Sequence, residues 1–390
     1  MPATVPGLGG YQSRWRTPDH HALAETVATF FTREVMPRED EFAAQGHTDR
    51  ALYHHAGALG LLGLSVPEDF GGGGGDFSHE TVLFEQQTYA GDASLGLAVH
   101  SGIVTGYLTA YGTDEQKSAY LPGLCSGELV GAIAMTEPSG GSDLQSMRTW
   151  AKPDGDALLV NGAKTFITNG RLADLLLLAV KTDRDEGAAG ISLLVCDLRD
   201  DPPGFRRGRT LHKIGLQAND TAELFFDDLR VPADAVLGGV PGQGFFQMMQ
   251  QLPQERLVIA VGAVAAMERA LALTTAYTKE RHAFGKPLYA QQNTRFTLAE
   301  CAALVRTGRT FLDDCVERHL AGDLDLPTAA MAKFHLTESQ CTVIDRCLQL
   351  FGGYGYMTEY PIARMYADAR AQKIYGGTNE IMKELLARAL

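Results

Sequence analysis

Two loops of small and polar residues could bind a cofactor in this chain. The first, Thr136-Glu137-Pro138-Ser139-Gly140-Gly141-Ser142-Asp143, follows the apolar segment 132–135. The second, Phe166-Ile167-Thr168-Asn169-Gly170, combines an aromatic ring with a hydroxyl group. Closely spaced backbone N–H groups and hydroxyls can hold a polar heterocycle or a pyrophosphate, and glycines let the ligand approach closely. Taken singly, however, each loop is also typical of a surface turn.

One acidic residue is a candidate for proton transfer. Glu255 lies in Leu252-Pro253-Gln254-Glu255-Arg256-Leu257, where Pro253 is typical of the first turn of a helix. The dipole of a helix favours a carboxylate in that turn, so position alone favours a structural role for Glu255. A general base for carbon chemistry would require the same residue type.

The remaining polar motifs have ordinary structural explanations. Arg281-His282-Ala283-Phe284-Gly285 follows a long helical pattern, and Gln349 precedes Gly352 and Gly353, so both segments are typical of a helix end. The histidine pairs at 20–21 and 54–55 are sequence neighbours, which point in different directions on a helix. We therefore predict no metal site.

Composition excludes some partners. The 390 residues are 45% hydrophobic, with a formal charge of −13 and a pI near 5.3, and an acidic field repels the phosphates of nucleic acid. The 6 cysteines show neither CxxC pairs nor framework spacing, which favours a reducing cytoplasm. Residues 1–15 lack the pattern of a secretory leader, and the apolar run 257–267 is too short to cross a bilayer. We expect a cytoplasmic protein without membrane insertion.

The hydrophobic pattern predicts three domains that position these residues. Residues 1–126 show apolar positions three and four apart, such as Leu23, Val27 and Phe30, and form an N-terminal α-helical domain. Residues 127–237 show short apolar runs without long helices between them, which indicates a middle antiparallel β-sheet domain. Within it, Asn161-Gly162 predicts a tight hairpin.

The third predicted domain, residues 238–390, is a C-terminal α-helical bundle. One helix is expected to begin near Pro253, and others to cover 294–319, 328–350 and 361–371, with a last one beginning near Asn379. Four helices of this size suggest a bundle. The fold class is α+β, mostly α.

In order and spacing, these motifs resemble the flavin-binding scaffold of the acyl-CoA dehydrogenase family over almost the whole chain. Besides the two loops, Gln349-Leu350-Phe351-Gly352-Gly353-Tyr354-Gly355-Tyr356 and Ile374-Tyr375-Gly376-Gly377-Thr378-Asn379-Glu380 carry the likeness. It is strongest to the long-chain members, through 252–257, 376–385 and Leu211-His212-Lys213-Ile214-Gly215-Leu216. The resemblance implies the three-domain acyl-CoA dehydrogenase fold and noncovalently bound FAD.

The resemblance also assigns site residues. Many relatives carry a catalytic glutamate where this chain has Gly376, whereas the long-chain and isovaleryl-CoA members carry the base at the position matched by Glu255. The implied substrate-binding residues are Ser142, Arg256, Tyr375 and Gly376. The implied FAD-binding residues are Met135, Thr136, Gly141, Ser142, Phe166, Thr168, Arg281, Phe284, Gln292, Gln349, Gly353, Thr378 and Glu380. At position 166 many relatives carry tryptophan.

The implied reaction is α,β-dehydrogenation of an acyl-CoA thioester, of medium to long chain, to the trans-2-enoyl-CoA. The family implies an electron-transfer flavoprotein as electron acceptor and a homotetramer, a dimer of dimers, in which Arg281 and Gln349 serve the neighbouring subunit's flavin. Three alternatives stay open: a short branched-chain enzyme of the isovaleryl type, an acyl-CoA oxidase, and a noncatalytic flavin-binding protein.

Overall fold

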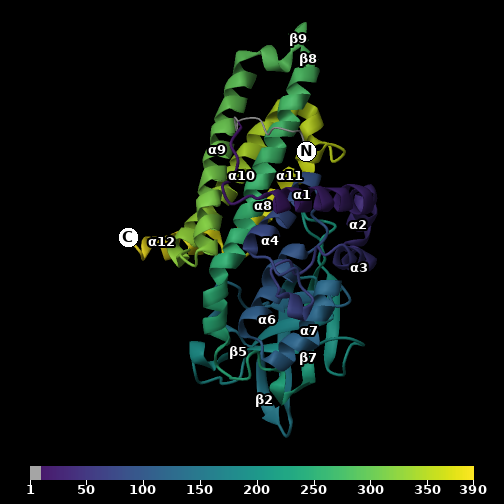
Figure 1. Ribbon diagram of the computed structural model, residues 1–390, viewed down its shortest axis with the longest axis vertical. Helices are drawn as coiled ribbons and strands as arrows, with labels where there is room; N and C mark the ends of the chain where they lie inside the picture. The colour runs from purple at the N-terminus through teal and green to yellow at the C-terminus, as the bar shows by residue number, and fades with distance from the viewer. Residues whose placement is uncertain (1–9) are drawn as a thin grey trace.

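Helices form both ends of the chain and strands its middle part. The computed structural model describes residues 10–390, so the first nine residues of the predicted N-terminal domain lie outside it. Figure 1 shows the β-sheet at one end of an elongated molecule and the C-terminal helices reaching the opposite end. The first helices lie beside the middle of this body.

The N-terminal helices are short and begin at polar residues. Asp76 starts one helix by accepting a hydrogen bond from the Ser78 amide, and Thr113 starts another by accepting from the Gln116 amide, as expected of N-caps. A π-helical turn, His100–Val104, joins α5 to α6. The helices are α1 (Pro18–Phe30), α2 (Glu39–Gln45), α3 (Ala51–Ala58), α4 (Phe77–Ala90), α5 (Leu97–Val99), α6 (Thr105–Tyr111) and α7 (Asp114–Ser126).

Seven strands form one sheet in the middle of the chain. They are β1 (Gly131–Ala134), β2 (Trp150–Asp154), β3 (Ala157–Thr168), β4 (Leu175–Lys181), β5 (Ile191–Asp197), β6 (Phe205–Thr210) and β7 (Thr221–Pro232). The order is β1-β4-β2-β3-β7-β6, with β5 also paired to β4. The predicted antiparallel pairing holds for β2–β3, β3–β7, β4–β5 and β6–β7, but it is wrong for β1 and β2 against β4, where both pairs are parallel.

The hairpin predicted at Asn161-Gly162 is wrong. Strand β3 runs straight through both residues, and Gly162 (φ 148°) lies where the register with β7 shifts. The turn between β2 and β3 instead contains Gly155, whose φ is 66°. A glycine in a strand can mark a bulge as well as a turn, and the two have the same local sequence.

The C-terminal helices are long and pack side by side. They are α8 (Gly244–Glu280), α9 (Gln292–Leu320), α10 (Leu326–Phe351), α11 (Pro361–Gln372) and α12 (Asn379–Ala387). Between α8 and α9 the short strands β8 (His282–Ala283) and β9 (Lys286–Pro287) form a hairpin at the tip of the molecule (Figure 1). The predicted helices at 294–319, 328–350 and 361–371 are confirmed within a few residues.

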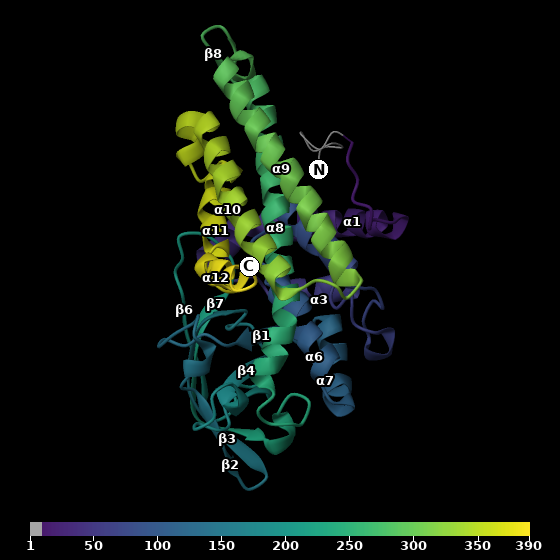
Figure 2. The ribbon, with the colours of Figure 1, turned by 90° about the vertical axis from the view of Figure 1, so that its left-hand side faces the viewer.

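The predicted helix start at Pro253 is wrong. Helix α8 begins at Gly244 and continues through Pro253, so that proline is an interior residue. By length and composition α8 could cross a membrane, but 72% of its most apolar window is buried inside the protein, as in a core helix. In Figure 2, α8 runs from the β-sheet to the far tip between neighbouring helices.

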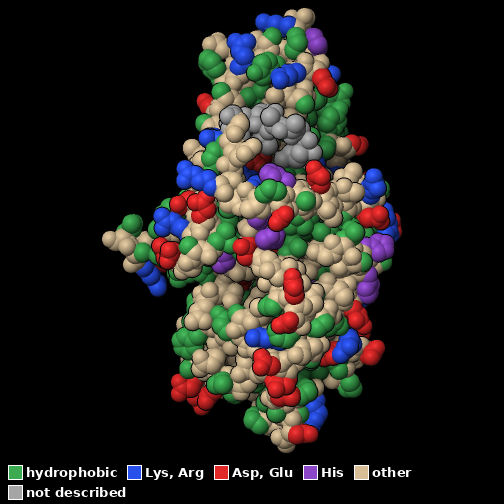
Figure 3. Space-filling view, in the orientation of Figure 1, with side chains coloured by type: hydrophobic (Ala, Val, Ile, Leu, Met, Phe, Trp, Pro, Cys, Tyr) green, Lys and Arg blue, Asp and Glu red, His purple; other side chains and the backbone are tan. Residues whose placement is uncertain are grey.

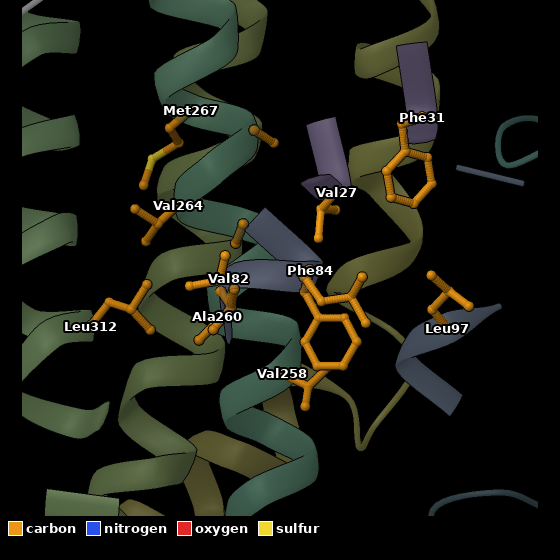
Figure 4. Packing of buried hydrophobic residues seen from close by; sticks show 14 of the residues in the cluster. Val27, Phe31, Val82, Phe84, Leu97, Val258, Ala260, Val264, Met267 and Leu312 are labelled. Carbon is orange, nitrogen blue, oxygen red and sulfur yellow. The ribbon is translucent and has the colours of Figure 1, made fainter. Parts of the chain in front are cut away.

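Helices from both ends of the chain share one hydrophobic core. Phe84 of α4 and Val258 of α8 are buried in it, and Val264, Met267 and Leu312 continue it between α8 and α9 (Figure 4). The sheet has its own core, which includes Val160, Leu176 and Leu224. Helix α8 is therefore held on several sides, which fixes the position of the side chains it carries.

Candidate active site

Glu255 lies in the interior of α8, eleven residues beyond Gly244, the first residue of the helix. The field of a helix terminus acts within the first turn, so the helix dipole does not explain this carboxylate. The Glu255 side chain is also buried, with 6% of the residue exposed. Buried acidic residues without an ion pair are rare in proteins, and a functional role accounts for this one better than helix stability does.

Tyr107 is the hydrogen-bond partner of Glu255. The Tyr107 hydroxyl, on α6, donates to Oε1 of Glu255 over 2.7 Å. Burial raises the pKa of Glu255 to about 7, because a low-polarity environment disfavours the charged form, while Tyr107 and the positive charge of Arg256 oppose that shift. A carboxyl group that titrates near neutral pH is suited to accept a proton at physiological pH.

Gly376 lies against the same helix, one turn beyond Glu255. Its φ is 64°, and a Cβ atom at this position would be 2.2 Å from Cδ1 of Ile259. A glutamate at 376 would therefore be strained by the positive φ, and the terminal methyl group of Ile259 would have to move. The Gly376 amide donates no hydrogen bond to another residue in the described part of the chain, so it can donate to a ligand.

Lys333 holds the loop that carries Gly376. From α10, its buried Nζ donates to the Gly377 carbonyl over 2.7 Å and to Oδ1 of Asn379 over 3.0 Å. Burial and the nearby charge of Arg256 lower the pKa of Lys333 to about 8. No motif in the sequence indicated Lys333, although a lysine spaced with Ala329, Ala330 and Leu336 on the apolar face of a helix is a sign of a buried charge.

Arg256 is buried beside Glu255, as the next residue on α8. Its Nε and Nη1 atoms have no hydrogen-bond partner among residues 10–390. Burial lowers its pKa to about 10, with Glu255 opposing the shift. Unpaired buried donors are costly, and they suit a residue that binds an acceptor group when a ligand is present.

The structure brings the first group of predicted flavin residues together at one edge of the sheet. The Thr165 amide donates to the Thr136 carbonyl over 2.9 Å, which joins the two loops. Gly141 lies against Thr136, since a Cβ on it would be 3.3 Å from the methyl group of Thr136. In the sequence, Met135 lies directly before Thr136 and Ser142 directly after Gly141, and both are at least partly exposed.

Phe166 gives this edge an exposed aromatic face. It lies at a register shift in β3 with φ 60°, a conformation uncommon for any residue but glycine, and is 67% exposed. Thr168, two residues on, is half-buried. An open aromatic ring beside threonine hydroxyls and free loop amides fits a flat, polar heterocycle such as the isoalloxazine of FAD.

The second group of predicted flavin residues is divided between two places. Thr378 and Glu380 lie at the start of α12, where the Thr378 hydroxyl accepts from the Ile381 amide, close to the Gly376 loop. Arg281 and Phe284 lie at or beside the β8–β9 hairpin, at the tip of the molecule remote from the sheet (Figure 1). Phe284 is 95% exposed there. Gln292, Gln349 and Gly353 are exposed at or near the ends of helices.

A cluster of side chains that could bind a metal ion already forms hydrogen bonds within the protein. One ring or carboxylate atom each of His20, Asp76 and His79 lies within 4.8 Å of the others. However, Nδ1 of His20 accepts from the Thr17 amide over 3.0 Å, and Nε2 pairs with the Ser78 hydroxyl over 2.7 Å. These contacts join the starts of α1 and α4, and we assign them a structural role.

Comparisons with known proteins identify the family over all three parts of the chain. The family models match as "Acyl-CoA dehydrogenase, N-terminal domain" over residues 17–128, "middle domain" over 132–229 and "C-terminal domain" over 242–390. The chain is 46% identical over 374 residues to the long-chain specific acyl-CoA dehydrogenase, mitochondrial, of Sus scrofa, which covers 95% of this chain and 86% of that protein.

Two solved structures are also similar. The acyl-CoA dehydrogenase from Geobacillus kaustophilus has a TM-score of 0.94 and 45% identity, with 97% of this chain and 99% of that one covered. A glutaryl-CoA dehydrogenase from Mycobacterium smegmatis, solved in complex with FADH2, has a TM-score of 0.91 and 27% identity, with 99% and 98% covered. The chain therefore belongs to the acyl-CoA dehydrogenase family of FAD-dependent oxidoreductases, which act on a CH–CH bond of acyl-CoA thioesters.

Proposed function

We propose that this protein converts acyl-CoA thioesters to trans-2-enoyl-CoA with Glu255 as the catalytic base. One observation carries the assignment of the base: a buried carboxyl that titrates near neutral pH lies on α8 one turn from the Gly376 loop. A side chain at position 376, as the alternative base requires, would be strained by the positive φ and would have to displace the terminal methyl group of Ile259. Both features agree with a base on α8 rather than on the loop.

The chain's own groups can perform the proton transfer. A thioester α-proton is only weakly acidic, so the carbonyl oxygen must be stabilised while the proton leaves. The free amide of Gly376 is positioned to donate to that oxygen, and Lys333 holds its loop in place. Glu255 then takes the α-proton. Arg256 adds unpaired donors and a positive charge beside the base.

The predicted FAD residues would hold the flavin between the edge of the sheet and the helices. Phe166 would contact the ring system, with Thr136 and Thr168 as polar contacts. The bound FAD would supply the redox chemistry, in which the β-hydrogen of the substrate is accepted as hydride. Ser142 and Tyr375, both exposed near these loops, would contact the substrate.

The acyl group is proposed to be of medium to long chain. The 46% identity to a long-chain specific enzyme supports this choice. We further propose an electron-transfer flavoprotein as the electron acceptor, a homotetrameric assembly and a cytoplasmic location. The remote position of Arg281 and Phe284 supports the assembly, because these residues are far from the loops of their own chain that would bind the flavin (Figure 1).

Anaerobic bleaching of the flavin absorption tests the function. The wild type, Glu255→Gln and the exposed-site control Glu25→Gln are titrated with saturated acyl-CoAs of graded length and with isovaleryl-CoA. We expect bleaching by medium and long chains in the wild type and in Glu25→Gln, and a loss of at least about 10³-fold in rate in Glu255→Gln. Bleaching of Glu255→Gln at the wild-type rate would reject Glu255 as the base.

The alternatives give different results in the same experiment. Preferential bleaching by isovaleryl-CoA would identify the branched-chain enzyme. Rapid oxygen consumption by the reduced protein in the absence of another acceptor would identify an oxidase. Bound flavin that no thioester bleaches would identify a noncatalytic protein.

A further inference from the structure

The proposed base is held by a residue from a different part of the chain. Tyr107 and Glu255 are 148 positions apart, and Tyr107 lies on α6 directly after the π-helical turn His100–Val104. Both side chains are buried, and the hydroxyl donates to Oε1 over 2.7 Å. Such a contact between two elements requires that α6 and α8 keep their relative position.

The hydrogen bond leaves one carboxylate oxygen available. Within residues 10–390, the hydroxyl of Tyr107 is the one group that hydrogen-bonds the Glu255 carboxyl, and it uses Oε1 alone. Oε2 has no hydrogen-bond partner among these residues and is not fully buried, although only 6% of Glu255 is exposed. The arrangement anchors one oxygen and leaves the other without a hydrogen bond, as a base that must meet a carbon-bound proton requires.

We propose that Tyr107 is a positioning residue for the reaction: its hydroxyl fixes the orientation of the Glu255 carboxylate through Oε1 and so directs Oε2 towards the α-carbon of the substrate. This inference depends on the proposed role of Glu255 as the base. It adds a residue that acts through Glu255 and that no sequence motif indicated.

Tyr107 also affects the proton affinity of the base. A hydrogen bond donated to the charged form of an acid favours that form, so it opposes the effect of burial on the carboxyl. The other groups that face this pair are Arg256 on α8, which also favours the carboxylate, and Tyr111 on α6, which is close to Tyr107. Lys333 on α10 acts on Arg256 and not directly on Glu255.

The test is the pH profile of flavin reduction in the holoenzyme. Tyr107→Phe keeps the ring and removes the hydroxyl, while Tyr111→Phe is the matched control, since its hydroxyl contacts Gln250 over 3.0 Å instead of the base. We expect the acid limb for Tyr107→Phe to move about one pH unit upward, which means about tenfold slower reduction on that limb. Tyr111→Phe should keep the wild-type profile.

A second replacement at position 107 keeps the proposal testable even if Tyr107→Phe misfolds. Site-specific 3,5-difluorotyrosine at position 107 keeps the hydroxyl but makes it more acidic and a stronger donor, so the acid limb should move to lower pH. Opposite shifts for the two replacements would support the proposal, because a purely structural role for Tyr107 would not reverse the direction.

The outcomes separate this inference from the function on which it rests. If Glu255→Gln is inactive while both replacements at 107 keep the wild-type profile, the positioning role is wrong and the base assignment stands. If Glu255→Gln reduces its flavin at the wild-type rate, the base assignment is wrong and the role of Tyr107 is rejected with it.

Discussion

Glu255 illustrates how little a local pattern says about one residue. From sequence spacing, this glutamate belongs in the first turn of a helix, where its charge is easily explained. The structure places it in the interior of α8 and pairs it with Tyr107. The resemblance to relatives identified Glu255 as a candidate base, but Tyr107 could not be found, because no local pattern indicates a contact across 148 positions.

The raised pKa of Glu255 predicts a pH-dependent cost in stability. Its pKa is about 7 in the folded protein against a usual value of 4.5. Well below pH 4.5 the carboxyl group is protonated in both the folded and the unfolded state, so it does not change the free energy of unfolding. As the pH rises towards 7 the unfolded state ionises first, so the wild type loses up to about 3 kcal/mol of stability.

Glu255→Gln should remove this cost. Its amide oxygen can still accept from Tyr107, so we expect a higher thermal unfolding midpoint than the wild type at pH 8 and nearly equal midpoints near pH 4.5. Differential scanning calorimetry at both pH values measures the difference. An equal gain at the two pH values would show that ionisation of Glu255 is not its cause.

Gly376 predicts a cost with two separable parts. An alanine there must adopt a left-handed backbone, which costs about 1 kcal/mol, and its Cβ would clash with Ile259, which adds about 1–3 kcal/mol. Gly322→Ala is the matched control, since Gly322 has φ 76° but open space around its Cβ position. Denaturation of both variants should show the larger loss for Gly376→Ala. Equal losses would indicate that Ile259 moves aside without cost.

At the scale of elements, the long helices could be predicted and the irregular joints could not. Apolar periodicity indicated α9, α10 and α11 within a few residues. Pro253 and Asn161-Gly162 gave wrong boundaries, because tertiary packing holds α8 and β3 continuous through residues that usually interrupt them. The parallel β1–β4 pair depends on contacts far apart in sequence, which periodicity does not encode.

Lys333 connects α10 to the Gly376 loop, so its replacement should reduce both the stability of the protein and the binding of substrate. Lys333→Met would leave the Gly377 carbonyl without its hydrogen bond from α10, so we expect a loss of about 2 kcal/mol and a several-fold higher KM for acyl-CoA. Lys383→Met is the control, because this exposed lysine pairs with Glu338 across the same helices over 3.1 Å and should matter by under about 1 kcal/mol. An unchanged KM for Lys333→Met would show that Lys333 does not affect substrate binding through the Gly376 loop.

At the scale of the whole molecule, acidic side chains are spread over the face seen in Figure 3, and no continuous basic surface crosses the described part of that face. This distribution agrees with the formal charge of −13 and gives no support to a nucleic-acid partner. The more informative feature is the separation of the predicted flavin residues. Figures 1 and 2 place the hairpin beside Arg281 far from the sheet.

This separation predicts complementation between inactive subunits. Glu255→Gln lacks the base, and Arg281→Ala lacks the residue proposed to reach the neighbour's flavin. In a mixed assembly, a subunit with Arg281→Ala keeps Glu255 and receives Arg281 from its partner. We expect activity to return when the two variants are dissociated and reassembled together, with each variant reassembled alone as the control. No recovery would place Arg281 in its own subunit's site.

Helix α8 sets the distance between the proposed base, Glu255, and Arg281 at the tip of the molecule. Arg281 directly follows the last residue of α8, 26 positions beyond Glu255, or about 39 Å at about 1.5 Å per residue. Deleting one residue between them would shorten that distance by about 1.5 Å and rotate the far end by about 100°. Substitutions in the same stretch would keep both length and phase. This segment can therefore vary in side chains while its residue count stays fixed, and changes in chain length belong in the loops.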